Sequence, residues 1–191
     1  MSPAAWGGRV VIADNEGTLL VFGASDWQLE AEVATDAVQP VAIAATVAAD
    51  HAFFADRKGL VVCVDLAAKT VVWQRKLDEA KSGGVFQDLA VDAGVVCACA
   101  KNTLYVLSAG SGAPLYAPIA GVSAPALLAG GELVYGTTDG SLKIATAATG
   151  KVLKSLALGA RVAAQPLATG DRLVLALANG ELVMVYPASI R

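Results

Sequence analysis

A segment of six residues occurs in five copies along the chain at nearly constant spacing, and this repeat constrains the fold more than any other feature. Each copy opens with a turn-forming residue, usually glycine, and continues with mostly apolar residues. The spacing is roughly 40 residues, a period at which solenoid repeats are helical, whereas helical periodicity is absent here. The copies begin at Gly17, Gly59, Asn102, Gly140 and Gly180.

Turn signals and further apolar stretches flank the copies in a constant register. Asp139-Gly140 and Asn179-Gly180 are dipeptides that favour the positive φ angles of tight hairpin turns. Beyond each copy a small polar segment leads into another extended stretch. This pattern therefore predicts that each unit contains four short antiparallel strands joined by turns. Three corresponding residues stand fourteen positions past the starts of the second, third and fourth copies: Trp73, Tyr116 and Lys154.

These features predict an all-β chain with a single domain over residues 1–191. The predicted fold is a β-propeller of about five four-stranded antiparallel repeats, the first and last incomplete. The alternative is a sandwich of irregular strands, which would not explain the constant register. The predicted repeats are approximately 7–36, 37–78, 86–120, 121–160 and 161–191.

The two incomplete repeats raise the question of how the sheet edges are covered. In this interpretation the chain opens with the strand at 9–13, so the first repeat lacks its innermost strand. The last repeat ends near Tyr186 and lacks its outermost strand. Because unpaired edges template aggregation, three arrangements stay open. The partial units close a small ring, the chain is part of a larger propeller, or a homodimer completes a ring.

The chain is unusually apolar, with a mean hydropathy of +0.57 and 16% charged residues. A membrane-spanning helix needs about 20 consecutive apolar residues. The longest run, at 41–49, is much shorter, so no transmembrane segment is predicted. The apolar runs at 95–100 and 173–177 instead resemble strands that are covered on both faces, as in blades packed between two neighbours.

Charge, the N-terminal sequence and the cysteines restrict the function further. The net charge is −3 and no basic residues cluster, so nucleic acid is not an expected partner. Residues 1–6 contain neither a basic nor an apolar region typical of a signal peptide, and none is predicted in this chain. The three cysteines, Cys63, Cys97 and Cys99, are predicted to be buried free thiols, since their number is odd.

The sequence of residues 139–153, Asp-Gly-Ser-Leu-Lys-Ile-Ala-Thr-Ala-Ala-Thr-Gly-Lys-Val-Leu, resembles the repeat of the pyrroloquinoline-quinone-type (quinoprotein alcohol dehydrogenase-like) β-propellers. Residues 59–73 form the second-best copy and keep the tryptophan, Trp73, that ends the family's repeat. The resemblance covers nearly the whole chain and implies a propeller fold. The family includes quinone-dependent alcohol and sugar dehydrogenases. It also includes non-enzymatic propellers, such as the outer-membrane assembly lipoprotein of Gram-negative bacteria.

The residues that the resemblance implies for the dehydrogenases are not all found here. Those enzymes have adjacent cysteines near the quinone, a bound calcium and a catalytic Asp, whereas Ala98 separates Cys97 from Cys99 in this chain. No quinone, calcium or other cofactor is therefore predicted. Residues 14–17, Asp-Asn-Glu-Gly, resemble half of a calcium loop, but calcium takes 6–8 oxygen ligands and a hairpin turn is the simpler interpretation.

No catalytic residue and no metal site is predicted. His51 is the only histidine, and no nucleophile or metal ligand lies beside it in the sequence, so we interpret it as a surface residue at a turn. The loop at 78–84 is a charged insertion and a plausible contact site.

Candidate binding residues lie where each innermost strand begins, because these starts converge on the central channel of a propeller. The alternative is that Gln and Pro at these positions only satisfy the geometry of strand entry. The candidates for binding a ligand or partner are Gln39, Gln87, Asp88, Arg161 and Gln165.

The predicted function is a non-catalytic β-propeller scaffold that binds a protein partner or a small ligand at its channel face. The alternative is a fragment or subunit of a quinone-dependent alcohol or sugar dehydrogenase. The family resemblance favours the bacterial periplasm or cell envelope as the location.

Overall fold

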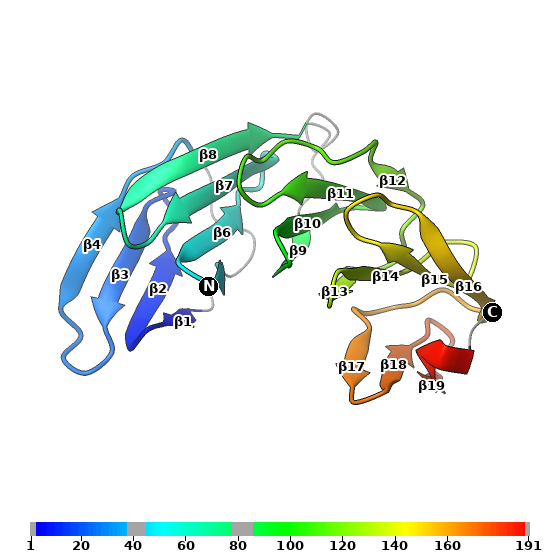
Figure 1. Ribbon diagram of the computed structural model, residues 1–191. Coiled ribbons are helices and arrows are strands. Elements are labelled where there is room, and N and C mark those ends of the chain that lie inside the picture. The colour runs from blue at the N-terminus through cyan, green and yellow to red at the C-terminus, as the bar shows by residue number, and fades with distance from the viewer. Residues whose placement is uncertain (1–2, 38–44, 78–85, 190–191) are drawn as a thin grey trace.

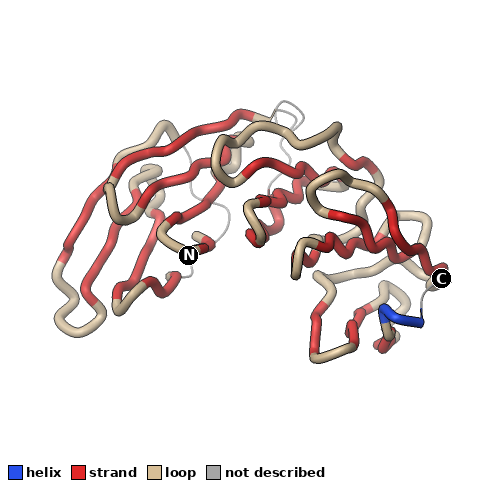
Figure 2. The backbone as a smooth tube through the Cα atoms, in the orientation of Figure 1, coloured by secondary structure: helices blue, strands red, loops and turns tan. Residues whose placement is uncertain are grey.

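The computed structural model describes residues 3–37, 45–77 and 86–189, and these form five antiparallel sheets that follow one another along an arc (Figure 1). Within each sheet the strands lie in chain order, from the inner side of the arc to its outer side. The predicted all-β propeller architecture is confirmed. Apart from one short 3-10 helix, η2 (Pro187–Ser189), the described chain is strands and the loops that join them (Figure 2).

The first sheet is complete. It contains β1 (Ala4–Trp6), β2 (Arg9–Ala13), β3 (Leu19–Gly23) and β4 (Leu29–Val33). The expectation that this sheet lacks its innermost strand is wrong, because β1 pairs with β2. Gly7 and Gly8 both have positive φ, 50° and 75°, and form the two-residue hairpin turn between these strands.

The next three sheets also have four strands each, and the fifth has three among the described residues. The second sheet contains β5 (Thr46–Ala48), β6 (His51–Ala55), β7 (Leu60–Asp65) and β8 (Thr70–Lys76). The third contains β9 (Phe86–Asp92), β10 (Val95–Ala100), β11 (Thr103–Ser108) and β12 (Ile119–Ala120). The fourth contains β13 (Leu127–Ala129), β14 (Glu132–Gly136), β15 (Ser141–Thr146) and β16 (Val152–Ala157). The fifth contains β17 (Leu167–Thr169), β18 (Arg172–Ala176) and β19 (Leu182–Val185).

The hydrophobic core consists of four clusters, one at each seam between successive sheets. Strand β10 shows why the chain is so apolar, since all six of its residues are buried. Val96, Ala98 and Ala100 belong to the cluster shared with the second sheet. Val95, Cys97 and Cys99 belong to the cluster shared with the fourth. The strand is therefore covered on both faces, as the sequence predicts.

A side chain of each middle sheet reaches across a seam to the following sheet. We call the residue fourteen positions past the start of each copy the docking residue. The docking residues Trp73, Tyr116 and Lys154 donate hydrogen bonds to the backbone carbonyls of Ala109 (2.8 Å), Ala147 (3.1 Å) and Pro187 (2.5 Å). Each acceptor lies seven residues past the start of the following copy, so one contact recurs with three chemically different side chains.

The aromatic docking residues also pack on glycines. A Cβ atom on Gly112 would lie 2.6 Å from the Trp73 ring, and one on Gly150 would lie 2.9 Å from the Tyr116 ring. Both glycines have positive φ, 66° and 68°. Glycine is therefore required here for its backbone conformation and for the space that the ring occupies.

The arc is open at its two ends (Figure 1). In the described part of the chain no hydrophobic cluster joins the first sheet to the fifth, so these five sheets do not close a small ring. On the fifth sheet Leu167, Leu182 and Met184 are 63%, 77% and 51% exposed. Within 173–177, Leu173 and Leu175 are buried against the fourth sheet, whereas Val174 and Ala176 on the other face are half-buried. The expectation that this strand is covered on both faces is wrong.

We expect Gly112→Ala to destabilise the protein more than Gly130→Ala. Both glycines have left-handed φ, 66° and 58°, but no atom lies within 4 Å of a Cβ built at Gly130. Each substitution should cost about 1–2 kcal/mol for the backbone conformation. At Gly112 the clash with Trp73 should add about 1–3 kcal/mol of overpacking. Urea unfolding of the two variants measures the difference, and equal losses would contradict ring-on-glycine packing.

Candidate functional site

The loops that lead into the next sheet are fixed to the hairpin turns of the sheet that they leave. The amide of Leu77 donates to the carbonyl of Gly59 at 2.9 Å, and that of Leu158 donates to the carbonyl of Gly140 at 2.8 Å. Val122 makes the corresponding bond to Asn102 at 2.9 Å. These bonds hold the loops and turns together as one rim of the arc.

A cavity of about 420 Å³ lies on this rim, and we call it the rim cavity. The third, fourth and fifth sheets all contribute to it, through hairpin turns and inter-sheet loops. It is lined by Lys101, Asn102, Ser123, Arg161, Val162, Ala163 and Ala178.

The polar groups of the rim cavity favour an anion. Arg161 is exposed, and Lys101 adds a second cation. The Ser123 hydroxyl oxygen is buried and has no hydrogen-bond partner among the described residues. The Asn102 side-chain amide donates to the Val122 carbonyl at 3.0 Å, which fixes the loop beside the cavity. Two cations and a hydroxyl suit a carboxylate, and none of the lining residues is an acid or a histidine that could serve as a general base.

The sequence-predicted site residues have different positions in the structure. Arg161 lines the rim cavity. Gln165 donates from Nε2 to the Ala126 carbonyl at 2.9 Å. This hydrogen bond joins the segment before the innermost strand of the fifth sheet to the segment before that of the fourth. Gln87 and Asp88 belong to β9, where Asp88 pairs with Cys99, and Gln39 lies outside the described residues. Binding by these five residues stays a prediction.

Sequence reasoning missed Lys101, Asn102 and Ser123 as partners of Arg161. One signal was available, since Asn102 is the only one of the five copy-initial residues that is not glycine. The loop at 78–84, proposed from the sequence as a contact site, lies outside the described residues.

A second cavity, of about 400 Å³, lies at the seam between the second and third sheets and contains His51. The sequence predicts His51 at a surface turn, and this is wrong, because His51 is the first residue of β6 and is half-buried. Its ring stacks on Phe53 with 6.3 Å between ring centroids. Asp92 also lines this cavity, and its carboxylate accepts a 3.3 Å hydrogen bond from the Gly131 amide. The lining residues include no serine, threonine or cysteine that could act as a nucleophile.

The three cysteines are free and buried, as the sequence predicts. Burial raises the pKa of Cys63 to about 12, with a further contribution from the charge of Asp65. Burial likewise raises the pKa of Cys97 to about 12, with Cys99 adding to the effect. These thiols remain protonated at neutral pH, which is the reverse of what a nucleophilic cysteine requires.

The chain's half-calcium-loop sequence forms a hairpin turn. Asp14 accepts hydrogen bonds from the amides of Glu16 and Thr18, both at 2.8 Å, through one carboxylate oxygen. Within 3–37, 45–77 and 86–189, no group of three or more histidine, cysteine, aspartate or glutamate side chains is placed to hold a metal ion. The same residues contain no helix that is long and apolar enough to cross a membrane.

We expect Cys63 and Cys97 to resist a thiol reagent at pH 8 in the native protein and to react once it is unfolded. Folding raises the pKa of both thiols from the ordinary value of 9.0. The contribution of the buried neutral thiols to the free energy of unfolding is therefore complete below that value and is lost as the pH rises towards 12. Urea unfolding from pH 7 to 11 measures the loss. Rapid labelling of the native protein would contradict the buried thiols.

Comparison with known proteins identifies a matching family and similar structures. The family model described as outer membrane protein assembly factor BamB matches residues 1–156. No curated protein matches the sequence. The crystal structure of BamB from Moraxella catarrhalis superimposes with a TM-score of 0.78 at 17% identity, covering 100% of this chain and 59% of that one. The chain thus spans well under two thirds of that relative.

Two other solved structures share the fold. Sqt1 of Saccharomyces cerevisiae gives a TM-score of 0.70 at 12% identity, covering 97% of this chain and 57% of its own. The computationally designed Ika8 protein gives 0.60 at 15% identity, covering 98% and 70%. At such identities these likenesses show the fold alone.

Proposed function

The chain belongs to the family of the outer membrane protein assembly factor BamB, and on this premise we propose that it is a scaffold that binds a protein partner during the assembly of outer-membrane proteins. The family match over residues 1–156 carries the proposal. A non-catalytic role and a location in the bacterial cell envelope are part of it.

The rim cavity is the surface we propose for the partner. Its groups come from three successive sheets and are held by backbone hydrogen bonds, so the partner meets a preformed surface. Arg161 and Lys101 favour a carboxylate of the partner, and the Ser123 hydroxyl gains a hydrogen bond that none of the described residues makes to it. An acidic segment of a partner protein is therefore the expected occupant.

A chain that acts in this way should restore function to cells that lack their own BamB. We expect the chain, exported to the periplasm of such a Gram-negative strain, to raise the outer-membrane protein content at least threefold over the empty vector. Arg161→Glu should remove most of this gain, because it replaces one of the two cations that line the rim cavity by an acid and so cancels the positive charge of the lining. Arg57→Glu, at an exposed hairpin turn outside the cavity, is the matched control.

Two results would contradict the proposal. One is equal activity of the Arg161→Glu and Arg57→Glu variants, and the other is no gain from the chain at an expression level confirmed by blotting. Calorimetric titration with pyrroloquinoline quinone and calcium tests the dehydrogenase alternative. Saturable micromolar binding would favour an enzyme over a scaffold.

A further inference from the structure

The seam between the first and second sheets lacks the docking contact that the next three seams share. Its docking residue is Ala31, which has no ring and no donor. The carbonyl that should accept the hydrogen bond belongs to Leu66, and none of the side chains in the described ranges donates to it. Lys69 stands where Gly112 and Gly150 lie in the following sheets.

Lys69 has the same backbone conformation as those glycines. Its φ is 58°, against 66° at Gly112 and 68° at Gly150. A side chain at this turn is tolerated only where no ring covers it, because a Cβ on either glycine would lie within 3 Å of the docking ring. Ala31 in place of a docking ring thus goes together with Lys69 in place of glycine. These two residues leave the docking site of this seam unfilled.

A cavity of about 190 Å³ lies at this place, and we call it the first-seam cavity. Its lining contains the three positions that define a docking site, namely the docking residue, the acceptor carbonyl and the glycine position. The lining residues are Trp6, Arg9, Val21, Glu30, Ala31, Leu66, Ala67 and Lys69.

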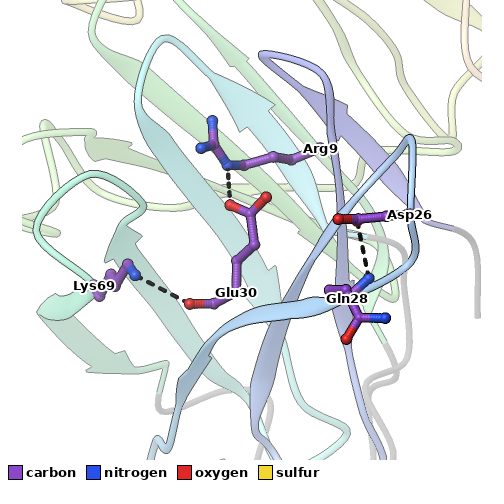
Figure 3. A network of polar contacts seen from close by, with 5 residues as sticks. All are labelled: Arg9, Asp26, Gln28, Glu30 and Lys69. Atoms are coloured by element: carbon purple, nitrogen blue, oxygen red, sulfur yellow. Dashed lines mark hydrogen bonds and ion pairs between the residues drawn. The ribbon is translucent and has the colours of Figure 1, made fainter.

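Three charged residues, Arg9, Glu30 and Lys69, line the cavity, and Figure 3 shows the contacts between them. Arg9 donates from Nε to the Glu30 carboxylate at 2.5 Å, and its guanidinium lies 5.1 Å from the centroid of the Trp6 ring. Lys69 donates from Nζ to the Glu30 backbone carbonyl at 3.0 Å. The terminal guanidinium nitrogens of Arg9 point away from Glu30 and have no hydrogen-bond partner among the described residues. Asp26 and Gln28 form a separate contact in the nearby turn.

We propose that the first-seam cavity binds an aromatic side chain of a partner polypeptide that carries a carboxylate next to that side chain. The ring occupies the space that Trp73 and Tyr116 fill at the following seams, between Ala31, Leu66 and the Trp6 ring. A ring with an N–H or O–H group donates to the Leu66 carbonyl. The neighbouring carboxylate pairs with the free nitrogens of Arg9 and with Lys69, since the lining has two cations and one acid.

The size of the cavity favours one side chain over a complete metabolite. A cavity of about 150 Å³ accommodates a benzene ring, whereas small-molecule sites usually span about 300–1,000 Å³. The first-seam cavity, at about 190 Å³, lies near the lower figure. The contacts offered are also those that protein side chains make at the other seams of this molecule.

Two peptides of matched shape test the proposal: acetyl-Ala-Trp-Asp-Ala-amide and acetyl-Ala-Trp-Asn-Ala-amide. Nuclear magnetic resonance follows the indole N–H of Trp6, which donates a 3.1 Å hydrogen bond to Asp50 at the edge of this seam. We expect saturable shifts with both peptides and a Kd at least fivefold lower for the Asp peptide. Indole-3-acetate supplies the same ring and carboxylate without a polypeptide and should bind more weakly than the Asp peptide.

Two variants separate the ring site from the charges. Ala31→Trp combined with Lys69→Gly fills the cavity from within the chain, and we expect this variant to unfold at higher urea and to lose peptide binding. Arg9→Gln combined with Lys69→Met keeps the cavity but should abolish the preference for Asp over Asn. Lys151→Met is the control, since Lys151 follows Gly150 at another seam. It should change neither peptide binding nor the preference for Asp over Asn.

Three outcomes would overturn the proposal. They are the absence of saturable shifts up to 10 mM peptide, unchanged binding to the folded filled variant, and tighter binding of indole-3-acetate than of the Asp peptide. If the filled variant does not fold, the Arg9→Gln, Lys69→Met variant decides. Retention of its fivefold preference for Asp would then refute the site.

Discussion

The burial of both faces of each inner sheet is the constraint on which the rest of this structure depends. A sheet covered twice favours apolar side chains on both faces of its central strands, and in β10 all six residues are apolar and buried. That preference explains the high mean hydropathy of a chain with no predicted membrane segment. It also leaves much of the polar chemistry to the turns and loops, which is where the rim cavity and Lys69 of the first-seam cavity lie. The other two charges of the first-seam cavity, Arg9 and Glu30, lie on strands β2 and β4 of the first sheet.

The fold could be predicted from the sequence because each repeat satisfies the same turn and packing rules. The Asp-Gly and Asn-Gly turns and the apolar phrases set the number of sheets and their strand order. The innermost strands were harder to see, because β1, β5, β13 and β17 each have only three residues, too few to show an alternating pattern. For β1 a turn signal existed in Gly7-Gly8, which the sequence interpretation did not use.

The candidate site could be predicted only in part, because it depends on which loops meet across seams. Arg161 was identified by its place before an innermost strand, yet Gln165, four residues later, bonds to the Ala126 carbonyl of the preceding sheet. Position within a repeat does not distinguish these two cases. Ser123 illustrates the same limit, since no sequence motif marks it, although its buried hydroxyl has no hydrogen-bond partner among the described residues.

The docking contact links the sequence of a repeat to its packing. One turn position carries glycine where a docking ring covers it and a larger residue where none does. Trp27, Lys69, Gly112 and Gly150 occupy this position in the first four sheets, and all have φ between 57° and 68°. Glycine stands at the two turns that a ring covers, and larger residues stand at the two turns without one. The left-handed conformation alone would favour glycine at all four. The choice between glycine and a side chain is therefore decided by the neighbouring sheet, so the sequence of one repeat reports on the packing of the repeat before it.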